Sequence, residues 1–108
     1  MRKSKTNHII QVYKKIKEVS NMYFLSLNKI IENRNITDAD SEKEIDFLVK
    51  VELAYSSLSD EGKKFINSEF FLDNYRGWWK GYYSKSQFYK HKKKYSIEFI
   101  RKLSIYVF

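Results

Sequence analysis

Apolar side chains recur along the chain in steps of three and four residues, the spacing of one face of an α-helix. The first third holds one long amphipathic segment, about residues 7–33. Its repeating positions are Ile9, Val12, Ile16, Val19, Tyr23, Leu27 and Ile30. No stretch sustains a two-residue alternation of apolar and polar positions, and proline is absent. The pattern therefore predicts an all-α protein, with residues 1–108 forming a single domain without a β-sheet.

Serine residues mark the expected starts of three further helices. Ser41 with Glu44, and Ser84 with Gln87, have the spacing of capping boxes, in which each side chain bonds the other residue's backbone N–H group. Ser59 is an N-cap candidate followed by acids, which the helix dipole favours in a first turn. With a short segment around two tryptophans, about five helices are expected. They cover about residues 7–33, 41–57, 59–72, 74–80 and 84–104.

Charge divides the chain into three blocks. Residues 1–31 carry seven basic side chains and one acid, whereas residues 32–73 carry five basic and eleven acidic side chains. Residues 76–108 carry nine lysines or arginines against a single acid, Glu98, within a total net charge of +8. This asymmetry would orient the molecule on a polyanion, with its C-terminal third towards the negative charge.

Several classes of function lack the residues they need. Cysteine is absent, so disulfides and thiolate metal sites are excluded, and no acid lies at metal-binding spacing from a histidine. No catalytic nucleophile set or glycine-rich phosphate loop is present, and the longest uncharged stretch, residues 19–28, is too short to cross a bilayer. We therefore expect a cytoplasmic protein that is not an enzyme and has neither cofactor, metal nor membrane anchor.

The basic helix expected over residues 84–104 has two distinct faces on a helical wheel. The core side carries Phe88, His91, Tyr95, Phe99 and Lys102, with Leu103 at its edge. The opposite side carries Ser86, Lys90, Lys93, Ile97 and Arg101. Residues in the first two turns are placed to read base edges and the later lysines to contact phosphates, although Gln87 also belongs to the capping box. The candidate DNA-binding residues are Lys85, Ser86, Gln87, Tyr89, Lys90, Lys93, Lys94 and Arg101.

Two features allow a structural or a functional interpretation. The aromatic series either packs in the core and turns or forms a stacking platform for single strands. Its members are Trp78, Trp79, Tyr82, Tyr83, Phe88 and Tyr89. The apolar face of residues 9–30 either packs within the chain or forms the seam of a homodimer.

The C-terminal pattern also carries a family resemblance. Its fixed positions read Ser84-x-Ser86-x-Phe88-Tyr89-x-x-Lys92-x-x-Tyr95-x-x-x-Phe99. This pattern resembles the helix-turn-helix of the ArpU-like and RinA-like phage late-gene transcription regulators, which are similar to region 4 of bacterial sigma factors. The resemblance covers about residues 41–104 and implies a helix-turn-helix at residues 74–104. The chain departs from the family where a small residue is replaced by Tyr95 and in the spacing between Gly81 and Ser84.

Together, these features predict a small transcription regulator that binds duplex DNA through the basic helix. The main alternative is a helical interaction module that has lost DNA binding and docks on RNA polymerase or another acidic partner. Non-specific RNA binding is a third interpretation, since the same basic surface would attract either polyanion.

Overall fold

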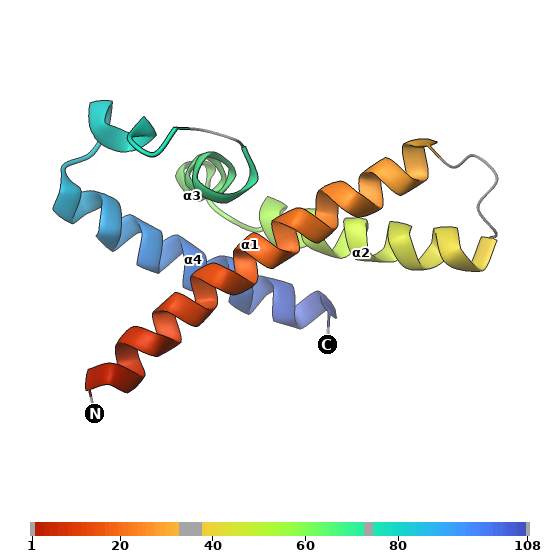
Figure 1. Cartoon of the computed structure of the whole chain (residues 1–108), viewed down its shortest axis with the longest axis horizontal. Coiled ribbons are helices and arrows are strands. Elements are labelled where there is room, and N and C mark those ends of the chain that lie inside the picture. Colours follow the sequence, from red (N-terminus) through yellow and green to blue (C-terminus); the bar gives the residue numbers. More distant parts are fainter. Residues whose placement is uncertain (1, 33–37, 73–74, 108) are drawn as a thin grey trace.

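A computed structural model describes residues 2–32, 38–72 and 75–107, and within these ranges most of the chain is helical, with no β-strand (Figure 1). Four α-helices form the framework. Their bounds are α1, Arg2–Glu32; α2, Asp38–Ser56; α3, Asp60–Ile66; and α4, Lys85–Val107. Two shorter elements complete it, the π-helix η1, Asn67–Phe71, and the 3-10 turn η2, Trp78–Gly81. Within the described ranges, no helix combines the length and apolarity that spanning a membrane requires.

α1 is the longest element, and it lies diagonally across α4 and beside α2 (Figure 1). Its buried stripe consists of Val12, Ile16 and Val19, and Ile16 has no exposed surface at all. These three side chains pack inside the chain, which confirms the intramolecular interpretation for them. A homodimer through residues 9–30 would therefore have to form without these three side chains, which are the central positions of the expected seam.

A single apolar core joins the four helices, because α4 contacts α1, α2 and α3. The helical pattern of the sequence predicts a common core made of Phe65, Ile66, Phe70, Trp78, Phe88, Tyr95 and Phe99. All of these residues are buried except Trp78, which is half-buried against the others. Phe65 is the central ring, with the centroids of Trp78, Phe88 and Tyr95 each 5.4–5.8 Å from its own.

The expected third helix, residues 59–72, changes its geometry partway along. α3 ends at Ile66, and the chain continues as the wider η1, where the Leu72 N–H group donates to the carbonyl of Asn67 at 2.7 Å. A carbonyl of this turn is bonded from outside, since the buried Ser20 hydroxyl of α1 donates to the Phe70 carbonyl at 3.0 Å. This buried hydrogen bond fixes the π-helix against α1.

The expected fourth helix, residues 74–80, forms only a single 3-10 turn. Asn74 lies outside the described residues, and the turn begins at Trp78 and ends at Gly81. The described chain thus has four α-helices rather than about five, and a full first helix of a helix-turn-helix is not found before α4. The start expected at Ser41 is also wrong, because α2 begins at Asp38 and Ser41 lies inside its first turn.

The two remaining predicted caps are confirmed. The Ser59 hydroxyl accepts a hydrogen bond from the Gly62 N–H group at 3.1 Å, and Asp60 and Glu61 occupy the first turn of α3. Ser84 and Gln87 exchange both bonds of a capping box: the Ser84 N–H group donates to Gln87 Oε1 at 3.0 Å, and the Gln87 N–H group donates to Ser84 Oγ at 3.2 Å. α4 therefore starts at a fixed residue.

Candidate nucleic-acid interface

The inner face of α4 holds the helix firmly against the core. Phe88, Tyr95, Phe99 and Leu103 are buried as the wheel predicted, and His91 is half-buried among them. Trp79 stacks on Phe88 with ring centroids 4.5 Å apart, which joins the η2 turn to the first turns of α4. The orientation of α4 about its own axis is thus set by packing from Phe88 to Leu103.

Lys92 belongs to this inner side, although it lies in a run of three lysines. Its ammonium group pairs with Glu69 at 2.9 Å and lies 4.5 Å from the centroid of the Tyr13 ring. Glu69 also accepts a hydrogen bond from the Trp78 indole at 2.8 Å. Lys92 therefore connects α4 to α1 and η1 and is not available to an external anion.

The outward face of α4 carries the predicted site residues, and all eight have exposed side chains. They are Lys85, Ser86, Gln87, Tyr89, Lys90, Lys93, Lys94 and Arg101. At about 100° per residue, Ser86, Lys90, Lys93, Lys94 and Arg101 fall within about 100° of arc. Lys85 and Tyr89 lie to one side of this row.

Two of the eight residues have internal roles as well. Gln87 Oε1 is engaged in the capping box, so its carbonyl oxygen does not point to a base edge. The Lys94 ammonium lies 5.3 Å from the centroid of the Tyr95 ring. Among the described residues, no ion pair involves Lys90, Lys93 or Arg101, and these three cations are the ones most available to phosphates.

An acid on α3 fixes the inner edge of this region. The Tyr95 hydroxyl donates to Glu61 Oε1 at 2.5 Å, and the Tyr83 hydroxyl donates to Glu61 Oε2 at 3.3 Å. The hydrogen bond from Tyr95, aided by the charges of His91 and Lys94, lowers the pKa of Glu61 despite its partial desolvation. Burial and the bond to Glu61 raise the pKa of Tyr95 to about 12.

Tyr95 fits this position because the facing residue has no side chain. A Cβ atom built on Gly62 would lie 3.0 Å from Tyr95 Cδ1 and 3.2 Å from Tyr95 Cε1. Glycine at position 62 of α3 thus leaves room for the bulky Tyr95 ring of α4 against the core.

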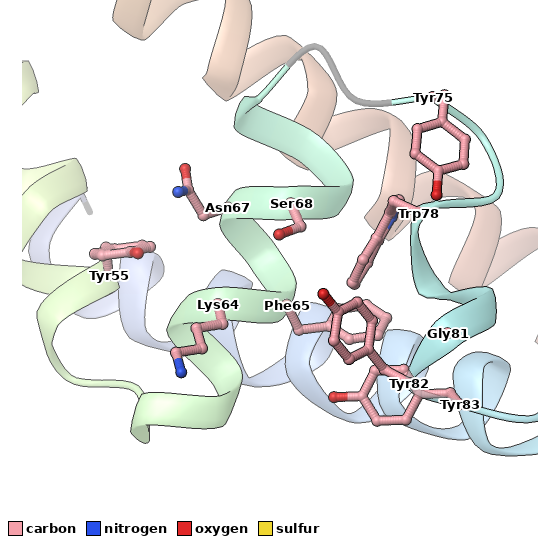
Figure 2. Close-up of a pocket in the computed structure, with 10 residues that line it drawn as sticks. All are labelled: Tyr55, Lys64, Phe65, Asn67, Ser68, Tyr75, Trp78, Gly81, Tyr82 and Tyr83. Atoms are coloured by element: carbon pink, nitrogen blue, oxygen red, sulfur yellow. The ribbon is translucent and has the colours of Figure 1, made fainter.

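A hollow of about 770 Å³ lies beside the start of α4, on the surface of α3 and η1 (Figure 2). Tyr55 of α2 stands at one end, and Tyr75, Trp78 and Tyr82 gather at the other, with Lys64 between them (Figure 2). We call this the tyrosine hollow. Six of its ten lining residues are aromatic: Tyr55, Phe65, Tyr75, Trp78, Tyr82 and Tyr83.

The sequence interpretation found only part of this hollow. Tyr82 and Tyr83 belong to the aromatic series considered earlier, but Tyr55 and Lys64 come from distant helices and carry no local signal. Within the series, Trp78, Trp79, Tyr83 and Phe88 pack in or against the core, as the packing interpretation predicted. Tyr82 lies outside this packing and is 78% exposed, whereas Tyr89 is 52% exposed although its ring contacts Phe88, with centroids 5.1 Å apart.

The described residues contain no group of three or more histidine, cysteine or acidic side chains arranged to hold a metal ion. No family of known proteins matches the chain, and no curated protein or solved structure is significantly similar to it.

Proposed function

We propose that the protein is a small transcription regulator that binds duplex DNA through the outward face of α4. The observation that carries this proposal is the exposed row of Lys90, Lys93, Lys94 and Arg101 on a helix whose other face is fixed in the core. From Lys90 to Arg101 this row extends about 16 Å along the helix axis. A helix with such a face fits the major groove, where cations along it neutralise phosphates.

Fewer residues are available to contact base edges than the sequence predicted. In the first turns of α4, Lys85, Ser86 and Lys90 are exposed, while the Gln87 carbonyl oxygen is already bonded. Lysine donors at these positions match the acceptors of guanine in the major groove. We propose that Lys85, Ser86 and Lys90 contact base edges and that Lys93, Lys94 and Arg101 contact phosphates, with Tyr89 packing beside the sugar-phosphate backbone.

The test is a double charge reversal, Lys90→Glu with Lys93→Glu. Both side chains point away from the core, so helicity should persist while affinity for duplex DNA falls. The loss of the Lys93 phosphate contact should also reduce the slope of log affinity against log salt by about one unit. Fluorescence anisotropy with a labelled duplex over a range of salt concentrations measures both quantities.

A matched control is available on α1. Lys14→Glu with Lys17→Glu changes the net charge by the same amount at two exposed positions that lack ion pairs among the described residues. This variant should lose much less affinity than the α4 variant, because its charges lie outside the proposed interface. Equal losses for the two variants would mean that net charge, rather than the α4 face, governs binding.

A second candidate function is docking on an acidic protein partner, such as RNA polymerase, through the same basic face. The specific observation in its favour is that a single 3-10 turn, Trp78–Gly81, stands where a helix-turn-helix has its first helix. Absence of duplex binding by the unaltered protein at moderate salt would favour this function over the first.

A further inference from the structure

The tyrosine hollow has the chemistry of a site for flat, anionic ligands. Aromatic faces stack on nucleobases with little regard to base identity. None of the ten lining residues is acidic, and Lys64 places an ammonium group between the aromatic ends. Among the described residues, Lys64 takes part in no ion pair, so its charge is available to a ligand.

The hollow has a fixed wall and a freely exposed rim. Hydrogen bonds hold two of the wall rings, since the Trp78 indole donates to Glu69 at 2.8 Å and the Tyr83 hydroxyl donates to Glu61 at 3.3 Å. The rim rings behave differently, because Tyr75 and Tyr82 are 75% and 78% exposed. A ligand seated in the hollow would bury part of both rings, which favours binding.

Gly81 adds an independent observation at the same place. Its φ angle is not positive, and a Cβ atom built there would meet no other atom within 4 Å. Neither backbone conformation nor packing therefore requires glycine at this position. The effect of the missing side chain is open space in the lining of the hollow.

We propose that the tyrosine hollow binds unpaired nucleobases of a single-stranded segment, beside the face of α4 that contacts the duplex. The proposal takes its nucleic-acid context from the proposed function. Tyr83 lies two residues before Lys85, whereas Arg76 and Lys80 of the same connecting segment line a separate hollow beside Tyr89. A strand whose bases enter the tyrosine hollow would thus have a phosphate close to Lys64, the cation in its own lining.

The experiment compares a thymidine oligonucleotide with an abasic oligonucleotide of equal length, using fluorescence anisotropy. Both carry the same phosphates, so the ratio of their affinities isolates the contribution of the bases. We expect the thymidine oligonucleotide to bind about fivefold to 100-fold more tightly, which is the range that base stacking on aromatic side chains gives. A uridine oligonucleotide in parallel distinguishes DNA from RNA as the source of the bases.

Two variants locate the effect in the hollow. Tyr75→Ala with Tyr82→Ala removes the exposed rings, and Gly81→Leu fills the open space in the lining. Either change should bring the affinity ratio close to one while leaving affinity for a blunt duplex unchanged. The reciprocal variant, Lys90→Glu with Lys93→Glu, should lower the affinity for the duplex and leave the ratio of thymidine to abasic affinity unchanged.

Failure of this proposal is distinct from failure of duplex binding. Equal affinity of the parent protein for thymidine and abasic oligonucleotides overturns the hollow as a base site, whatever the duplex result. A ratio that survives both hollow variants does the same. Proline-rich peptides also dock on tyrosine-lined grooves, and binding of such a peptide without any base-dependent ratio would assign the hollow to a peptide instead.

Discussion

Replacing Gly62 by alanine sets two physical effects of opposite sign against each other. Alanine has a higher helix propensity than glycine, by about 1 kcal/mol in a helix interior and less in a first turn. Against this, the new methyl group would lie 3.0 Å from Tyr95 Cδ1 and 3.2 Å from the capping oxygen Ser59 Oγ. Separations this short force one of the neighbours to move.

The neighbours of Gly62 have little freedom to move. Tyr95 is 3% exposed, its ring stacks on His91 at 5.6 Å, and its hydroxyl is bonded to Glu61. Overpacking of this kind costs about 1–3 kcal/mol, and displacement of a capping hydroxyl costs about 1 kcal/mol. The clash therefore outweighs the gain in propensity, and we expect Gly62→Ala to lower the free energy of unfolding by about 1–3 kcal/mol.

Urea unfolding followed by circular dichroism measures this free energy. In a Tyr95→Leu background the ring is gone and only the contact with Ser59 Oγ remains, so Gly62→Ala should be close to neutral there, with a coupling energy of about 1–3 kcal/mol between the two positions. Gly81→Ala is the matched control, since its methyl group meets no atom within 4 Å. A Gly62→Ala protein as stable as the parent, or an equal cost in both backgrounds, would refute the reasoning.

Two further predictions concern the core and the pH dependence of stability. Ile16→Asp places a charge where no surface is exposed, so circular dichroism should show an unfolded chain, with a loss of about 3 kcal/mol or more. If light scattering shows that the parent is a dimer and that the variant is a folded monomer, the homodimer through residues 9–30 would be supported instead. The pKa of Glu61 is lowered, so its contribution to stability is present above its ordinary pKa of 4.5 and is lost as the pH falls further. The pKa of Tyr95 is raised from 10.0 to about 12, so its contribution is present below pH 10 and is lost as the pH rises towards 12. Unfolding free energies measured against pH should show both losses diminished in Tyr95→Phe, and identical profiles for the two proteins would contradict this assignment.

Local features of the chain were predictable because the interactions that cause them are local. The caps at Ser59 and Ser84 depend on bonds to residues three positions away, and both are confirmed. The two faces of α4 follow from helical spacing, and Phe88, Tyr95 and Phe99 are buried as expected. The start of α2 was missed because residues 37–41 include several residue types that cap helices, and spacing alone does not decide between them.

Features that depend on distant segments left no signal in the sequence. The inward position of Lys92 requires Glu69 and Tyr13 from two other elements, whereas the two residues that follow it in sequence are also lysines. The π-helix after Ile66 is stabilised by Ser20, which lies in α1. In the tyrosine hollow, Tyr55 is brought to the connecting segment only by the packing of α2 against the rest of the fold. Each case depends on tertiary contacts that helical periodicity does not contain.

The inward position of Lys92 has a consequence for how this sequence can change during evolution. The three adjacent lysines look equivalent in the sequence, but different structural constraints act on them. Position 92 is tied to an acid at position 69, since either charge alone would remain partly buried without its partner. In descendants of this chain, the residues at positions 69 and 92 should therefore change together. Whether Lys93 is retained should depend instead on the ligand that binds this surface.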